Sequence, residues 1–114
     1  MPFVRITTAK KLDDSAKNKL HEEIIKIMPV LPGKDKDNTL LCIEGGADMY
    51  RSGEPNDGIF AEVRLYKKSP EDAKKEFSAK IYAIFKEVLN ITDSSCIYLN
   101  FIEFENWSAN GNYF

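Results

Sequence analysis

Two segments of the chain, "AKNKLHEEIIKIM" at 16–28 and "AKKEFSAKIYAIF" at 73–85, decide the fold. They lie 57 positions apart, and both space their apolar residues as the buried face of a helix does. The matched apolar positions are Ala16, Leu20, Ile24, Ile27 and Met28 in the first segment and Ala73, Phe77, Ile81, Ile84 and Phe85 in the second. The chain is therefore predicted to contain one structural unit twice.

The segments that flank each helix repeat as well. "LLC" at 40–42 matches "IYL" at 97–99 with the same offset, and "VRI" at 4–6 matches "VRL" at 63–65 with an offset of 59. Each unit is thus a strand, a helix and a strand, within halves of about 1–57 and 58–114 of a single domain. Right-handed crossovers place both helices on one face of one sheet. We expect an α+β fold, a tandem βαβ repeat with a four-stranded mixed sheet.

Local signals predict where these elements begin and end. Asp13 or Asp14 would cap the first helix, and Ser69 would cap the second, with Pro70 in its first position. Strands are predicted at 2–8, 39–46, 59–66 and 95–104, and irregular segments at 49–58 and 105–114.

The strands predict that the sheet is covered on both faces. "LLCI" at 40–43 and "CIYLNFI" at 96–102 are apolar at successive positions, which is typical of strands without a solvated face. Both helices cover the same face, and the tail at 105–114 is too short to cover the other. We therefore expect the sheet to be covered by oligomerisation.

Composition excludes several classes of protein. The 114 residues carry a net charge of −2 without a basic block, so neither nucleic acid nor a membrane is an expected partner. No apolar run could span a bilayer, and no secretory signal is recognised, so a cytoplasmic location is expected. Cys42 and Cys96 lie in apolar runs, there is no CxxC, and His21 is the single histidine. Buried reduced thiols are predicted, and neither a metal site nor a cofactor is expected.

The second residue allows two interpretations. Pro2 is tolerated at the start of a strand, where it lacks only an N–H. If Met1 is removed, Pro2 instead carries a secondary amine at the chain terminus. An α-amino group has a pKa of about 7.7–8.0, and burial or nearby positive charge lowers it, so this amine would be a competent base near pH 7. Lys34 and Arg64 are candidate cations for this effect and for binding an α-keto carboxylate.

The chain resembles the tautomerase superfamily, whose longer members include macrophage migration inhibitory factor and D-dopachrome tautomerase. The resemblance covers nearly the whole chain and rests on "MPFVRITT" at 1–8, "LPGK" at 31–34, "IYLNF" at 97–101 and "NWSANGNYF" at 106–114. It implies a homotrimer whose sheets form a central barrel, with active sites between neighbouring subunits. It also implies phenylpyruvate-like keto–enol tautomerase activity, with Pro2 as the general base.

The same resemblance assigns further residues to the site. Lys34 falls where relatives bind a substrate carboxylate. Tyr98 and Asn100 match a pair contributed across the subunit interface, and such groups could donate hydrogen bonds to the oxygen that gains charge as the enol forms. Phe114 matches a terminal aromatic region near the pocket.

Other aromatic residues suit an aromatic substrate. Tyr66, Trp107 and Phe114 would supply ring-bearing surroundings. Tyr66 departs from the family, which has a small or aliphatic residue there, so it is expected to narrow the pocket or change its preference. The segment between Asn100 and "NW" is also shorter than in the mammalian cytokines, which leaves the register of Trp107 open.

The candidate residues have structural alternatives. Lys34 could be a solvated lysine of a turn, and Tyr98 a half-buried strand aromatic. Arg64 could pair with Glu62 or Glu103 on the sheet surface.

The fold also allows other functions. A cytokine-like binding or signalling protein would retain the fold with vestigial activity. The resemblance implies that a hydratase or dehalogenase using the same base would need extra arginines and a carboxylate near Pro2; Arg5, Arg51 and Arg64 are present in the chain.

Overall fold

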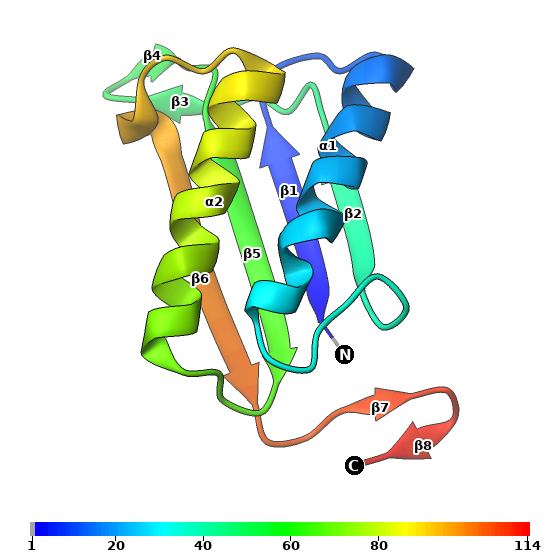
Figure 1. The fold of residues 1–114 in the computed structure, drawn as a ribbon. Coiled ribbons are helices and arrows are strands. Elements are labelled where there is room, and N and C mark those ends of the chain that lie inside the picture. The colour runs from blue at the N-terminus through cyan, green and yellow to red at the C-terminus, as the bar shows by residue number, and fades with distance from the viewer. Residues whose placement is uncertain (1) are drawn as a thin grey trace.

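The computed structural model describes residues 2–114, which form a four-stranded sheet, two helices on one face of it, and two short hairpins (Figure 1). In chain order the helices and strands are β1 (Phe3–Thr8), α1 (Asp14–Ile27), β2 (Leu40–Glu44), β3 (Tyr50–Arg51), β4 (Glu54–Pro55), β5 (Ile59–Tyr66), α2 (Glu71–Leu89), β6 (Ile97–Phe104), β7 (Ser108–Ala109) and β8 (Asn112–Tyr113). Short 3₁₀ turns follow α1 at Met28–Val30 and precede β6 at Ser94–Cys96.

The sheet has the order β2-β1-β5-β6 and is mixed. β1 pairs with β2 in parallel, β5 pairs with β6 in parallel, and the central strands β1 and β5 are antiparallel. Each parallel pair is joined through one helix, α1 or α2. The predicted α+β fold with two helices on one face is therefore confirmed.

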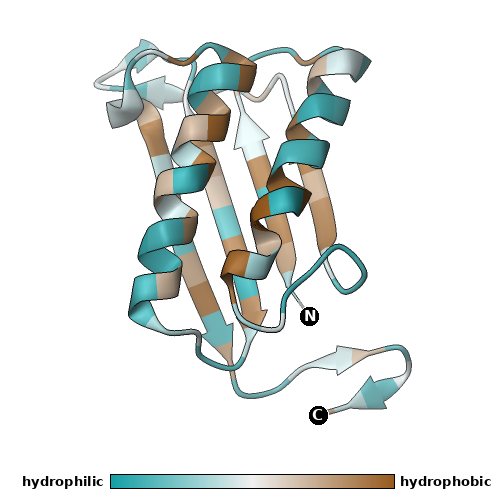
Figure 2. Ribbon diagram, in the orientation of Figure 1, coloured by the Kyte–Doolittle hydropathy of each residue, from teal (hydrophilic) through white to brown (hydrophobic). Residues whose placement is uncertain are grey.

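The core lies between the helices and the sheet. Leu20 and Ile24 of α1 and Phe77 and Ile81 of α2 are fully buried, as the repeat predicted. They pack with the strand residues that point to the same side, such as Val4. In Figure 2 the strands behind the helices are largely hydrophobic, but hydrophilic bands interrupt β5.

One of the two predicted helix starts is correct. Asp13 caps α1, because its Oδ1 accepts a hydrogen bond from the Ala16 N–H at 2.8 Å. The predicted cap at Ser69 is wrong: α2 begins at Glu71 after Pro70, and no side chain caps it. Ser69 is instead buried, and its backbone N–H donates to Oε2 of Glu103 at 2.6 Å. A contact with the distant strand β6 thus takes precedence over the local capping signal.

The uncovered face of the sheet differs from the apolar surface that was expected. Arg5 lies between Cys42 and Glu62 in the strand register, and Glu62 lies beside Asn100, so one row across the four strands is mainly polar. Aromatic residues flank this row, including Tyr98, which is 57% exposed. Strand alternation explains the difference, because every second residue of β1 and β5 points away from the core.

Both segments that were predicted to be irregular contain a hairpin. β3 and β4 pair across Ser52 and Gly53, and β7 and β8 pair across Asn110 and Gly111, all four of which have positive φ. Two such residues form the type I′ turn that two-residue hairpins favour, and "NG" is its strongest sequence signal. The tail hairpin projects from the body of the fold in Figure 1.

Both cysteines are free, and both are half-buried, so the predicted burial is wrong. Cys42 lies in the edge strand β2, and Cys96 ends a 3₁₀ turn at the surface. Among the described residues, neither helix has the length and hydrophobicity to span a bilayer.

Candidate active site

Pro2 is buried at the end of the sheet where β5 finishes. Its carbonyl accepts a hydrogen bond from the Leu40 N–H at 3.0 Å, and the next residue, Phe3, pairs with Arg64. The start of β1 is therefore held between β2 and the last residues of β5. The state of Met1, on which a free Pro2 amine depends, lies outside the described residues.

Lys34 reaches the same end of the sheet. It lies in the turn after α1, and its Nζ donates to the Tyr66 carbonyl at 3.5 Å. Gly33 precedes it with a φ of 77°, a conformation that favours glycine, so the turn directs the chain back toward β2. Lys34 is half-buried, which differs from the fully solvated turn lysine considered as an alternative.

Aromatic side chains gather beside these groups. The rings of Tyr66 and Phe114 lie 5.7 Å apart, and those of Phe104 and Trp107 lie 6.1 Å apart. The Phe114 N–H donates to the Trp107 carbonyl at 2.8 Å, which folds the end of the tail back and determines its register. A hollow of about 350 Å³ adjoins the cluster and is lined by Phe3, Arg64, Phe104, Asn106, Trp107 and Ser108.

Arg64 points to the uncovered face and pairs loosely with Glu62, at 3.7 Å between Nη2 and Oε1. Of its two predicted partners, Glu103 is taken by Lys74 on the helix side of the sheet. The Nε of Arg64 is buried without a hydrogen-bond partner within the described chain.

Tyr98 and Asn100 lie elsewhere in the subunit. Extending the β1–β5 register by one residue places Pro2 beside Leu65, which pairs with Glu103. At 3.3–3.4 Å per residue, Tyr98 is then about 17 Å away along the sheet, too far for it and Pro2 to contact one small substrate. Asn100 is about 10 Å away along the sheet and also two strands across it. Tyr98 instead lines a hollow of about 340 Å³ at the other end of β6, together with Met49, Tyr50, Arg51, Asn56, Gly58, Ile59, Phe60 and Cys96. One subunit therefore places Pro2, Lys34 and the aromatic cluster at the same end of the sheet, and places Tyr98 and Asn100 farther along it.

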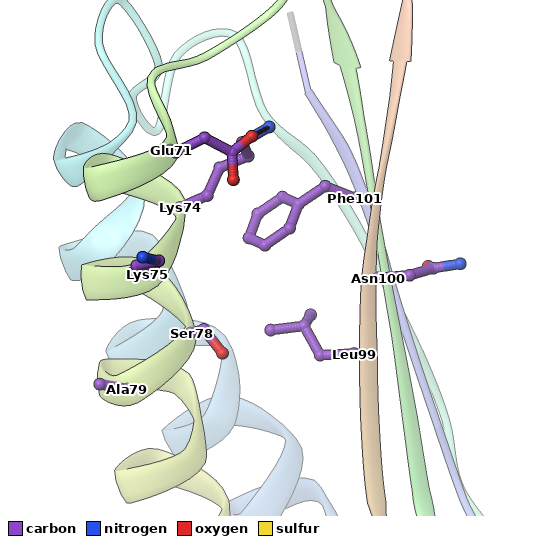
Figure 3. A pocket seen from close by; sticks show the side chains of 8 residues that line it. All are labelled: Glu71, Lys74, Lys75, Ser78, Ala79, Leu99, Asn100 and Phe101. Atoms are coloured by element: carbon purple, nitrogen blue, oxygen red, sulfur yellow. Dashed lines mark ion pairs between the residues drawn. The ribbon is translucent and has the colours of Figure 1, made fainter.

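A further hollow, of about 600 Å³, lies between α2 and the edge strand β6 (Figure 3). Phe101 and Leu99 point into it, whereas Asn100 points away from it, on the other side of the strand. Of the two lysines that line it, Lys75 is exposed, and Lys74 is already paired at 2.9 Å with both Glu71 and Glu103. Because the buried cation is already paired within the chain, we do not assign a site there.

The contact between Glu103 and Lys74 shifts the pKa of both groups. The pKa of the Glu103 carboxyl is raised by burial, but the Ser69 N–H and the Lys74 ammonium outweigh this effect and hold it below its ordinary value. The pKa of Lys74 is raised by its hydrogen bonds with Glu71 and Glu103. This cluster connects α2 to β6 and supports the fold.

One residue near the site was missed by the sequence analysis. Lys67 follows Tyr66, and its Nζ lies 5.3 Å from the centroid of the Tyr66 ring. It has a φ of 66°, in the left-handed region that lysine rarely adopts. Its position directly after Tyr66 could have indicated that it lies near the site, but a lysine at a strand end is usually solvated.

The sequence matches no protein-family model, and no curated protein matches it. Solved structures match over nearly the whole chain. The MIF2 protein of Leishmania major has a TM-score of 0.90 at 19% identity, covering 100% of this chain and 97% of its own. The macrophage migration inhibitory factor homologue of Prochlorococcus marinus has a TM-score of 0.83 at 22% identity, covering 98% of each chain.

A further match is Pt0534, solved after inactivation by 2-oxo-3-pentynoate. It has a TM-score of 0.78 at 17% identity, covering 90% of this chain and 85% of its own. These identities show the fold alone. The chain therefore has the fold of macrophage migration inhibitory factor, as the sequence resemblance predicted.

Proposed function

We propose that the protein is a keto–enol tautomerase of the phenylpyruvate tautomerase kind, with the amine of Pro2 as the general base after removal of Met1. The observation that carries the proposal is the placement of Lys34 and Tyr66 at the end of the sheet where β1 begins. A cation, an aromatic cluster and a chain terminus then border one region, which suits an aromatic 2-oxo acid.

The reaction moves one proton between C3 and the oxygen on C2 of the substrate. Lys34 would hold the carboxylate, and Arg64 lies close enough in the register to add positive charge. Both charges favour the neutral form of the Pro2 amine, which can then take the proton from one atom and return it to the other. Tyr66 and Phe114 would contact the ring of the substrate.

Completion of the site requires a second copy of the chain. Tyr98 and Asn100 would donate hydrogen bonds to the C2 oxygen as it gains charge, but they lie far from Pro2 in their own subunit. They are exposed on the uncovered side of the sheet, beside Phe60, which is 40% exposed. A homotrimer packed through its sheets would bury these aromatic residues and bring the two half-sites together.

The inactivator of Pt0534 supplies a direct test. An alkyne conjugated to a ketone accepts a neutral amine, so 2-oxo-3-pentynoate should label a free Pro2 nitrogen in this protein. We expect one equivalent of label on Pro2, located by mass spectrometry, and parallel loss of phenylpyruvate tautomerisation. A form that retains Met1 has an amide at this nitrogen and should be neither labelled there nor active.

Variants of Pro2 test the role of the base. Pro2→Ala and Pro2→Gly, with Met1 removed, keep a terminal amine but lose the proline ring that holds it in position, and they should lower kcat/KM by about 100-fold. If the processed wild type is no faster than these variants, the proposal is wrong. Unchanged thermal unfolding of the variants would show that the loss is chemical.

The other functions find less support in the geometry. A hydratase or dehalogenase would need several arginines around Pro2. Arg5 is paired with Glu44 and Glu62 in the middle of the sheet, and Arg51 donates to Ser95 near the opposite end. A cytokine-like role would become the preferred interpretation if the processed protein lacked activity but kept its oligomeric state.

A further inference from the structure

Two lysines contact Tyr66, one at its backbone and one at its ring. The Nζ of Lys34 lies 3.5 Å from the Tyr66 carbonyl oxygen, and the Nζ of Lys67 lies 5.3 Å from the centre of its ring. Within residues 2–114, neither ammonium group has a carboxylate within 4.0 Å. Two cations that lack an acidic partner thus contact one aromatic residue, Lys34 at its backbone carbonyl and Lys67 at its ring.

The backbone at Lys67 does not explain why a lysine stands there. Its N–H donates to the Phe104 carbonyl at 2.7 Å, which connects the ends of β5 and β6, and glycine would make the same bond. A φ of 66° costs a lysine free energy that glycine would not lose. The presence of a lysine at this position must therefore be explained by its side chain.

The surroundings of Tyr66 indicate what would lie between the two cations. The Phe114 and Tyr66 ring centroids lie 5.7 Å apart, so Lys67 stands next to a pair of aromatic rings. An aromatic ring would stack there, with one end toward Lys34 and the other toward Lys67.

We propose that Lys67 binds a second anionic group, so that the preferred substrate is an arylpyruvate whose ring carries an anion far from its 2-oxo acid group. The inference rests on the proposed function, because it takes Lys34 as the residue that holds the 2-oxo acid. Lys67 is then a specificity-determining residue, and its effect appears as a preference between substrates.

Two substrates that differ by one carboxylate test this preference. With Met1 removed, kcat/KM is measured for phenylpyruvate and for (4-carboxyphenyl)pyruvate. We expect the wild type to prefer the carboxylated compound by about tenfold or more, the value of one charge-assisted hydrogen bond. Lys67→Gly should reduce the ratio to about one, and Lys67→Arg should preserve it.

The choice of variants separates binding from folding. Glycine suits a positive φ, so Lys67→Gly removes the charge without straining the strand end. Lys68→Ala removes the neighbouring exposed lysine and is the matched control, for which the ratio should be unchanged. An equal preference in the wild type, or a preference that survives Lys67→Gly, would overturn the proposal.

A binding measurement separates this proposal from the proposed reaction. Trp107, the single tryptophan, lies by the site, so its fluorescence can report binding of phenylacetate and 4-carboxyphenylacetate, which cannot tautomerise in the same way. If the dianion binds more tightly through Lys67 but neither substrate is turned over, the anion-binding role of Lys67 is supported and the tautomerase proposal is wrong. If both substrates are turned over and both acids bind equally, the tautomerase proposal is supported and the role of Lys67 is wrong. If the protein neither binds these acids nor turns over either substrate, both proposals are wrong.

Discussion

Arg5 of β1 and Glu62 of β5 face each other on the uncovered side of the sheet, with Nη1 of the guanidinium 3.8 Å from Oε2 of the carboxylate. Glu62 also lies 3.7 Å from Arg64, so two arginines share one carboxylate. The Nε atoms of both arginines are buried without hydrogen-bond partners within the described chain. Glu62 therefore balances charge on the face that the proposed trimer buries.

Neutralising Glu62 should weaken assembly. Glu62→Gln leaves Arg64 without its carboxylate and Arg5 with Glu44 alone, and in the assembled trimer removing one partner of a buried ion pair costs about 3–5 kcal/mol. We expect the dissociation constant to rise more than about 100-fold, measured by light scattering across a dilution series. Glu22→Gln, an exposed position on α1, is the control and should leave the mass unchanged. A Glu62→Gln protein that stays assembled at all dilutions would contradict burial of this face.

Removing Lys34 should weaken substrate binding more than it slows the chemical step. Lys34→Ala deletes the group assigned to the carboxylate, and a hydrogen bond to a charged group contributes about 1.5–3 kcal/mol. We expect KM for phenylpyruvate to rise by about 10–100-fold with a smaller change in kcat. Lys36→Ala changes an exposed lysine of the same turn and should have no such effect. A fall in kcat alone would place Lys34 in the chemical step instead.

The pair of Glu103 and Lys74 should make stability depend on pH. The pKa of Glu103 is lower in the folded protein than its ordinary value of about 4.3. Its contribution is therefore present above that value and is lost as the pH falls through the folded pKa. Urea unfolding measures this dependence. The free energy of unfolding of Glu103→Gln should fall less steeply than that of the wild type as the pH is lowered, and at pH 7 it should be lower by about 1–3 kcal/mol. Glu76→Gln on the exposed face of α2 should unfold like the wild type at every pH.

The tail hairpin should depend on the left-handed residue at its turn. Gly111 has a φ of 77°, and an alanine there costs about 1–2 kcal/mol. We expect Gly111→Ala to weaken the hydrogen bond from the Phe114 N–H to the Trp107 carbonyl and to expose the Trp107 ring. The measurement is a red shift of the Trp107 fluorescence emission. Gly53→Ala strains the equivalent turn of the other hairpin, at a φ of 79°, and should leave that emission unchanged. An unshifted Gly111→Ala spectrum would show that other contacts hold the tail.

Repetition in the sequence was sufficient to predict the sheet and its helices. Leu20 and Phe77 stand 57 positions apart and are both fully buried, because helical periodicity reports the face that a helix turns to its core. The strand ending at Tyr66 was predicted with the same limits that β5 has. The Ser69 prediction was wrong because the local capping signal competes with the hydrogen bond that the Ser69 N–H donates to the Glu103 carboxylate, 34 residues away.

The candidate site was less accessible to sequence reasoning. Nothing near Lys34 in the chain shows that its ammonium group reaches Tyr66, since 32 residues separate them. Lys67 has the appearance of an ordinary surface lysine until its φ and its distance from the Tyr66 ring are known.

The sequence by itself determined the two βαβ units and the residues that form the core, because both depend on local periodicity that recurs along the chain. Only the tertiary structure decided which side chains share the uncovered face and which border Pro2. Strand register places Arg5 beside Glu62 and separates Tyr98 from Pro2, and register depends on pairing between segments that are distant in sequence.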